Sequence, residues 1–273
     1  MNRYTVKTGL LETLMVVIAL VFVSPLYILV NVSLKTAMGF ESPLAPANPV
    51  TFDNFAQAFV EADMLNAFIN TVAIAAISLT AVILFSSLAG YGIARLTSGW
   101  SRAAFITFLL GLLLPYQLAT VPLFQLMLAA DLLGTIWSLV LFYTALMMPF
   151  SVFLYASFIR SLPTDFEEAA EVDGAGPIRI FFRIVFPMMR AVTGTIIILN
   201  VISIWNDFFT PRLFLFGTGT ETLIVALYRF VGRYVSEWPV VFGGLIVASA
   251  PILILFFILQ RYIIRGFAGG VKG

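Results

Sequence analysis

The 273-residue sequence contains no cysteine and no histidine, and only 11% of its residues are charged. Without cysteine, disulfides and thiolate chemistry are excluded. Without histidine, imidazole acid–base catalysis and the usual zinc and haem ligand sets are excluded as well. A serine or carboxylate enzyme stays open on composition alone. The net charge of +1 argues against a nucleic-acid partner, whose phosphates call for a concentrated basic patch.

Apolar residues dominate what is there, since 61% of the sequence is hydrophobic and the mean hydropathy is +1.03. Apolar stretches of about 18 or more residues recur along the chain, and each is long enough to cross a bilayer as a helix. We therefore predict an all-α integral membrane protein with one transmembrane domain over 1–273. Its six expected spans cover residues 10–32, 68–93, 103–130, 135–159, 192–209 and 240–262.

Two of these spans carry special features. Arg3 and Lys7 precede the first apolar run, as in a secretory signal, but the run is too long for one and no small-residue cleavage site follows. We expect a retained span. The third span contains Pro115 and Pro122, which free backbone carbonyls and permit kinks in a packed bundle.

The placement of lysine and arginine predicts the orientation of the spans. With six spans, the two termini, the 95–102 link and the 160–190 loop share one side and hold eleven of the fifteen basic residues. Because positively charged loops are retained inside the cell, that side is the cytoplasm. Residues 33–67 and 210–239 are then the extracytoplasmic loops.

The most polar stretch is the 160–190 loop, which holds five carboxylates and four arginines. So many charges cannot lie in lipid, so the loop lies in water or against a protein. Thr164 and Glu167 have the spacing of a capping box and predict a helix from Asp165. Gly174 is suited to end that helix, and Pro177 to begin the next.

Helical spacing predicts two faces on this short helix. Phe166, Ala169, Ala170 and Asp173 share one face, whose small residues permit the close approach of a partner. Glu167, Glu168 and Glu171 share the other face and are expected in solvent. An ordinary loop with two interfacial helices stays an alternative, whereas acid–base catalysis by these solvated acids is the weaker interpretation.

The order Glu168-Ala169-Ala170, Gly174, Ile184 and Pro187 resembles the EAA signature of membrane-spanning subunits of bacterial ATP-binding-cassette importers. Phe186 stands where that family usually has leucine, and both residues are large and apolar. In the family this loop is a coupling helix that docks in a groove of the ATPase. The resemblance therefore implies ATPase coupling for Glu168, Ala169, Ala170 and Gly174. We include Phe166 and Asp173 among the expected coupling residues, because they belong to the same short segment.

The resemblance extends over nearly the whole chain and narrows to permeases of the carbohydrate-uptake class, which includes the smaller maltose permease subunit. Each further marker is weak alone, but their order is specific. These markers are Thr51-Phe52-Asp53-Asn54-Phe55, Asn70-Thr71, Tyr91-Gly92-Ile93-Ala94-Arg95, Trp205-Asn206-Asp207 and the terminal Gly266–Gly273.

Polar residues inside spans are candidates for a translocation pathway. Asn200, Ser203 and Asp207 are predicted to form one stripe on the fifth span, with Asn206 beside it. Gln117 and Gln125 in the third span are similar candidates, and Trp205 is a weaker one. The alternative is that Asn200 and Ser203 bond to neighbouring helices as packing contacts and that Asp207 pairs with Arg212.

The resemblance implies a permease subunit of an ATP-driven, binding-protein-dependent importer of a sugar or oligosaccharide, in the bacterial cytoplasmic (inner) membrane. A polyol or glycerol phosphate stays an alternative solute. The sequence lacks a Gly-x-x-x-x-Gly-Lys-Ser/Thr phosphate loop, so we expect no cofactor on this chain and no enzyme activity, with ATP and Mg²⁺ handled by partner ATPases. The expected partners are two ATPase subunits, a second related permease, an extracytoplasmic solute-binding protein and membrane lipid, with no nucleic acid.

Two alternative functions belong to other classes of membrane protein. An ion-coupled secondary transporter usually has coupling carboxylates in the membrane and inverted repeats, and only Asp207 lies deep enough to qualify. An intramembrane enzyme is disfavoured because the spans contain no histidine, no cysteine and no clustered acids.

Overall fold

The computed structural model describes residues 6–36, 42–231 and 237–269. The prediction concerning Gly266–Gly273 lies partly outside this range, and Arg3 and Arg233 lie outside it. The chain divides into two compact units, Met1–Leu65 with Ile224–Pro251 and Asn66–Leu223 with Ile252–Gly273. The expectation of one domain over 1–273 stays a prediction.

The first unit contains α1 (Val6–Ser33), α2 (Asp53–Glu61), most of α12 (Leu223–Leu227), the short 3₁₀ turn η4 (Tyr228–Phe230) and the start of α13 (Trp238–Gly269). The buried Asn54 side chain donates hydrogen bonds to the carbonyls of Ser33 (2.8 Å) and Lys35 (2.7 Å), which fastens α2 to the end of α1. A Cβ on Gly243 would lie 3.3 Å from the Asn54 backbone, so α13 packs closely on α2.

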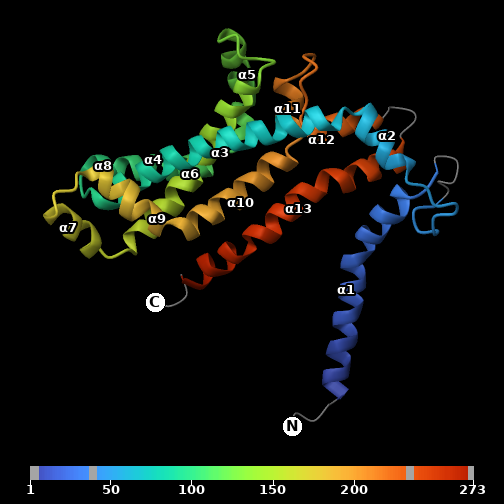
Figure 1. Ribbon diagram of the computed structural model, residues 1–273, viewed down its shortest axis with the longest axis horizontal. Coiled ribbons are helices and arrows are strands. Elements are labelled where there is room, and N and C mark those ends of the chain that lie inside the picture. Colours follow the sequence, from blue (N-terminus) through green and yellow to red (C-terminus); the bar gives the residue numbers. More distant parts are fainter. Residues whose placement is uncertain (1–5, 37–41, 232–236, 270–273) are drawn as a thin grey trace. The chain divides into compact units, whose positions relative to one another are not determined.

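The second unit holds the longest succession of helices (Figure 1). In chain order they are α3 (Met64–Arg95, from Asn66), α4 (Gly99–Leu113), η2 (Tyr116–Ala119), α5 (Thr120–Ala129), α6 (Ile136–Arg160), α7 (Asp165–Val172), α8 (Pro177–Ile180), the π-helical turn η3 (Phe181–Val185), α9 (Phe186–Met188), α10 (Arg190–Asn206) and α11 (Phe209–Phe214), followed by the end of α13.

Among the described residues of the whole chain, four helices are long and apolar enough to cross a membrane, namely Lys7–Ser33, Met64–Arg95, Ile136–Arg160 and Trp238–Ile258. Two bent pairs, Gly99–Leu113 with Tyr116–Ala129 and Pro177–Met188 with Arg190–Asn206, bring the number to six if each pair is one span. The predicted all-α membrane fold is confirmed.

The predicted third span is bent by 91°. Leu114, with φ −83° and ψ 122°, is extended because the ring of Pro115 disfavours helical geometry in the residue before it. Pro122 does not break α5, because it lies in the first turn, where a backbone N–H has no partner within the helix.

α6 is the most buried of the four long candidate spans. A Cβ on Gly90 of α3 would lie 2.7 Å from Cβ of Tyr155, so the two helices touch almost backbone to backbone. On its α10 side, α6 makes three hydrogen bonds, described below. Tyr155 and Ile159, both on α6, are fully buried in the core of this unit. This packing fixes the ends of α3, α6 and α10, from which the candidate site is built.

Candidate functional site

The 160–190 loop folds as the sequence predicts at most of its boundaries. α7 begins at Asp165, and Pro177 is the first residue of α8. The predicted capping box is wrong, however, since the Thr164 side chain makes no capping hydrogen bond. The Thr164 hydroxyl instead donates to Oε1 of Glu168 at 2.7 Å. The Glu167 side chain has a different partner, described below.

The end of α7 depends on Gly174. Its φ of +79° lies in the left-handed region, which side chains with a Cβ rarely adopt. The Gly174 N–H donates to the Glu171 carbonyl and the Ala175 N–H to the Ala170 carbonyl, both at 2.9 Å. These are the two bonds of a Schellman motif, so the predicted glycine end of the helix is present.

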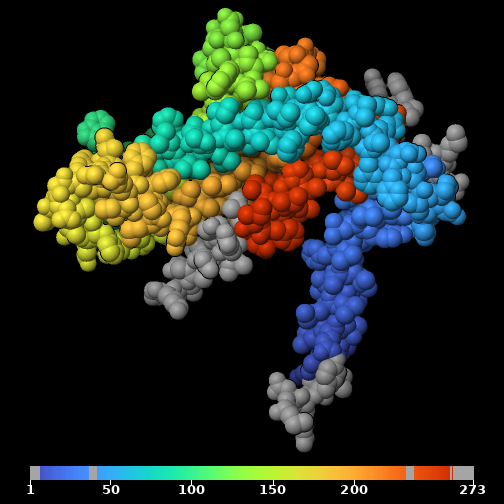
Figure 2. Space-filling view, viewed as in Figure 1, coloured from blue at the N-terminus to red at the C-terminus, as the bar shows by residue number. Residues whose placement is uncertain are grey.

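α7 presents an outward and an inward face. Phe166, Ala169 and Asp173 are exposed, as are Glu168 and Gly174. Figure 2 shows the segment that contains them, in yellow, at one end of the second unit. The nearby Val172 is 89% exposed. Ala170 differs from the face predicted for it, because it is half-buried and packs against the core.

Glu167 corrects the prediction that three acids of α7 lie in solvent. Only 12% of its side chain is exposed, because Oε1 accepts hydrogen bonds from Nε (2.9 Å) and Nη2 (2.7 Å) of Arg95. Its Oε2 accepts from the Tyr91 hydroxyl at 2.9 Å. Nη2 of Arg95 also donates to the Leu162 carbonyl at 3.3 Å. This Glu167 cluster, composed of Tyr91, Arg95, Leu162 and Glu167, was not predicted as a site.

One signal for the cluster was present in the sequence. Tyr91 and Arg95 are four residues apart, so they lie on one face of α3 and point to the same place. Their acidic partner is 72 residues further along the chain, and helical spacing within the loop does not reveal it.

The second half of the loop is anchored by aromatic packing. The part of the loop that begins at Pro177 buries Ile180, Phe181 and Val185. The Phe181 ring lies 5.3 Å from that of Tyr91 and 4.9 Å from that of Phe182. Arg179 and Arg183 are exposed. The loop is therefore joined to α3 by an apolar contact beside the charged cluster.

Polar residues of α10 and its C-cap Asp207 fall into two groups, and Thr193 joins the predicted candidates Asn200 and Asp207 in the first. Thr193, Asn200 and Asp207 are seven residues apart and meet α6. Thr193 accepts from the Tyr155 hydroxyl at 3.0 Å, the Asn200 amide donates to the Ser151 hydroxyl at 3.3 Å, and Asp207 accepts from the Tyr143 hydroxyl at 3.0 Å. Ser203 and Asn206 are exposed.

The remaining candidates lie apart from this row of bonds. Trp205 is buried, with its ring edge-on to Phe68 at 5.9 Å. Gln117 is exposed in η2 and Gln125 is exposed in α5. Asp207 does not pair with Arg212 as the alternative interpretation had it, since no ion pair within 4.0 Å joins these two described residues. The Arg212 guanidinium lies 5.2 Å from the centre of the Phe216 ring.

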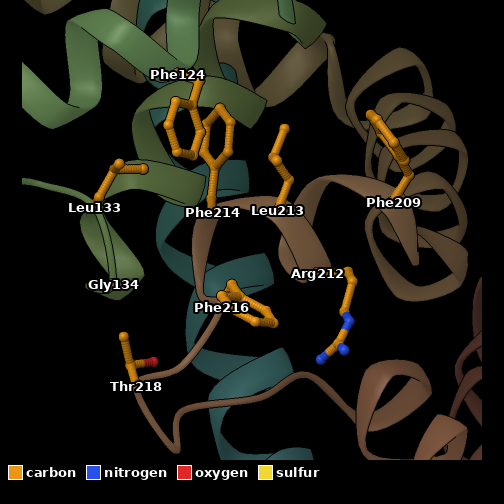
Figure 3. A pocket seen from close by; sticks show the side chains of 9 residues that line it. All are labelled: Phe124, Leu133, Gly134, Phe209, Arg212, Leu213, Phe214, Phe216 and Thr218. Atoms are coloured by element: carbon orange, nitrogen blue, oxygen red, sulfur yellow. The ribbon is translucent and has the colours of Figure 1, made fainter. Parts of the chain in front are cut away.

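A pocket of about 420 Å³ lies beside α11 (Figure 3). Phe124 and Phe214 line it with their ring centres 6.3 Å apart, and Arg212 contributes its one cationic group. The Gly134 N–H donates to the Phe214 carbonyl at 2.8 Å, which joins the α5–α6 link to α11. Within the described ranges, no three acidic side chains come together as metal ligands.

Comparisons with known proteins agree on one family. Residues 8–269 match the family model described as a binding-protein-dependent transport system inner membrane component. The melibiose/raffinose/stachyose import permease protein MelC of Bacillus subtilis is 36% identical over 271 residues, with 98% of each chain covered. The probable starch degradation products transport system permease protein AmyC of Thermoanaerobacterium thermosulfurigenes is 31% identical and is covered, like this chain, over its full length.

A solved structure shows the same fold. It belongs to a bacterial ABC transporter involved in the import of the acidic polysaccharide alginate and superposes with a TM-score of 0.80 at 18% identity, covering 96% of this chain and 99% of the other. With a family model that matches nearly all of its length, the chain belongs to the binding-protein-dependent transport system inner membrane components, which are multi-pass ABC-transporter permeases and not enzymes.

Proposed function

We propose that the chain is the permease subunit of an ATP-driven, binding-protein-dependent importer of a sugar or oligosaccharide. The observation that carries the proposal is the full-length similarity to import permeases named for melibiose, raffinose and stachyose and for starch degradation products. Permeases named for lactose and for multiple sugars are 33% identical over four fifths of the chain. These relatives do not favour a polyol or glycerol phosphate over a sugar.

ATPase coupling is assigned to Phe166, Glu168, Ala169, Ala170, Asp173 and Gly174. The outward face of α7 supports this assignment, since Phe166 is 56% exposed although it is large and apolar, and Ala169 beside it allows a partner to approach closely. Ala170 acts from the inner side by packing α7 on the core. ATP closes the ATPases, α7 moves with them, and the spans reorient around a central cavity.

The proposed assembly contains two ATPase subunits, which hold ATP and Mg²⁺, a second related permease and an extracytoplasmic binding protein. The predicted orientation places both termini and the 160–190 loop in the cytoplasm and the loops 33–67 and 210–239 outside. The spans are those predicted from the sequence, with the third bent between α4 and η2 and the fifth formed mainly by α10.

The pathway is assigned to Gln117, Asn200, Ser203, Trp205, Asn206 and Asp207, of which Gln117, Ser203 and Asn206 are exposed. Asp207→Ala tests the assignment. A pathway role predicts that uptake falls while assembly with the partners is kept. Equal loss of uptake and assembly would make Asp207 a packing residue.

The proposed function is tested by uptake in cells whose proton gradient is collapsed while ATP is retained. An ATP-driven importer continues to accumulate solute, whereas abolished uptake would favour an ion-coupled transporter. Screening α-galactosides, starch fragments, polyols and glycerol phosphate for stimulation of ATPase activity through the binding protein identifies the solute class.

Two variants test the docking assignment. Gly174→Asp and Ala169→Trp are expected to leave the permease inserted but to detach or uncouple the ATPase. If co-purification with the ATPase and solute-stimulated ATP hydrolysis both survived these changes, the assignment would be wrong.

A further inference from the structure

The Glu167 cluster lies behind the proposed docking face, on the inward side of α7. Its members come from three segments that are distant in sequence. Tyr91 and Arg95 end α3, Leu162 lies in the link after α6, and Glu167 lies in the first turn of α7. One guanidinium thus bonds to both the link and α7, while the Tyr91 hydroxyl holds the other carboxylate oxygen.

Electrostatics favours this arrangement in several ways at once. Two N–H groups of Arg95 bond to one carboxylate oxygen, and charge-assisted bonds of this kind are about twice as strong as neutral ones. The side chains of Arg95 and Glu167 are only 18% and 12% exposed, which limits screening by water and salt. Arg95 lies at the C-terminus of α3 and Glu167 near the N-terminus of α7, the ends at which the helix dipoles favour these charges.

The chain itself joins the loop to α6 and, through η3 and α9, to α10, but not to α3. Contacts between side chains therefore provide the direct connection from α7 to α3. They include the Glu167 cluster and the contact between the Tyr91 and Phe181 rings. The cluster bonds to α7 itself, whereas Phe181 belongs to η3.

We propose that Glu167, held by Arg95 and Tyr91, is a positioning residue that makes α7 and the end of α3 move as one body, so that movement of the coupling helix reaches α3. The inference rests on the proposed function, because it specifies how the same loop acts on the spans. Glu167 does not contact the ATPase in this account. It acts by positioning α7.

The first test compares Glu167→Gln with Glu171→Gln, a matched change at an exposed acid of the same helix. Both are assayed as assembled transporters for solute-stimulated ATP hydrolysis and for solute imported per ATP. We expect Glu167→Gln to keep ATP hydrolysis but to import about 5-fold to 150-fold less solute per ATP, the usual range of coupling between sites. Glu171→Gln is expected to match the parent protein. Equal solute per ATP in the two variants would overturn the inference.

A charge exchange separates positioning from simple packing. Arg95→Glu combined with Glu167→Arg restores an ion pair of opposite polarity, although the helix dipoles then oppose it. Partial recovery of solute per ATP, compared with either single change, is expected. A double variant no better coupled than the single variants would count against a pairwise role.

The second test measures the distance between the end of α3 and α7. Because the chain has no cysteine, spin labels can be placed specifically at Leu96→Cys and Glu171→Cys, two exposed positions just after α3 and on α7. The inference predicts the same distance between labels in nucleotide-free and ATP-bound transporter, and a change between the states once Glu167→Gln is added. A distance that changes in the parent protein would contradict the inference. If the parent transporter showed no ATP-dependent uptake at all, the proposed function would have failed instead.

Discussion

Glu167 and Asp207 each accept a hydrogen bond from a tyrosine hydroxyl, but only Glu167 also pairs with a cation. The Asp207 carboxylate accepts hydrogen bonds from the Tyr143 hydroxyl at 3.0 Å and from the Thr210 N–H at 3.2 Å. Within the described ranges, no basic side chain lies within 4.0 Å of this carboxylate. Tyr143, which bonds to Asp207, lies on α6, and Leu162, which bonds to Arg95, lies just after α6. At about 1.5 Å per helical residue, the two residues are separated by roughly 25–30 Å.

The difference fits the two ends of a permease. A carboxylate held by arginine keeps its position when the loop is pulled, because separating the pair leaves two charges poorly solvated. A carboxylate held by a hydroxyl and one N–H loses less interaction energy when it changes partner. We infer that the Glu167 cluster transmits force and that the contact between Tyr143 and Asp207 is the one free to rearrange around a solute.

Removing the cation is expected to have the largest effect. Arg95→Ala leaves the mostly buried Glu167 without its counter-charge, which costs about 3–5 kcal/mol of stability for a buried pair. Arg95→Ala with Glu167→Gln is the control, since it removes the uncompensated charge and should recover part of the loss. Thermal unfolding of the purified transporter in detergent measures both. A double variant less stable than Arg95→Ala would show that the charge is not the cause.

Tyr143→Phe is expected to rank second. It removes a hydrogen bond to a charged group that has no cation to replace it, at a cost of about 1.5–3 kcal/mol. The same unfolding assay applies, and Asp207→Asn is the matched control because the amide oxygen still accepts from Tyr143. We expect Asp207→Asn to lower the stability of the transporter less than Tyr143→Phe does, but to lower solute uptake more.

Gly174→Ala should follow. A residue with a Cβ at φ +79° is strained by about 1–2 kcal/mol, although open space surrounds the position. Because the Schellman motif fixes the direction in which α7 ends, we expect ATPase binding to weaken along with stability. Gly176→Ala, in open space at ordinary φ, is the control and should change neither.

Tyr91→Phe is expected to have the smallest effect of the four. Glu167 keeps both bonds from Arg95, which still compensate its charge, so we expect a loss no larger than the lower end of the range for a hydrogen bond to a charged group, about 1.5 kcal/mol. The comparison with Tyr143→Phe is direct, because both changes delete one tyrosine hydroxyl bonded to a carboxylate. If Tyr91→Phe proved the more damaging, the proposed difference between the two ends would be reversed.

The sequence predicted local geometry well wherever one residue type determines it. Pro115 ends α4, Gly174 ends α7 and Pro177 begins α8. Proline restricts φ and glycine permits positive φ, whatever surrounds them in the fold. The EAA resemblance identified the loop. These features depend on residues within a few positions of one another.

Contacts between distant segments were not predictable in the same way. Helical spacing grouped Glu167 with Glu168 and Glu171, since it describes one helix and not what that helix packs against. Ser203 was assigned to the stripe of Asn200 and Asp207, but at about 100° per residue it lies about 60° from Asn200, whereas Asp207 and Thr193 each lie within about 20°. Thr193 completes the row that meets α6, and its seven-residue spacing was the available signal.

The most direct test of the account is the reactivity of single cysteines along α7 towards a membrane-impermeant maleimide. The cysteine-free chain allows Phe166→Cys, Ala169→Cys and Val172→Cys on the outward face, with Ala170→Cys as the inward control. We predict that the three outward positions react in the permease without its ATPase and become protected in the assembled transporter, while Ala170→Cys reacts slowly in both. Outward positions that stay equally reactive after assembly would contradict the claim that this face of α7 binds the ATPase.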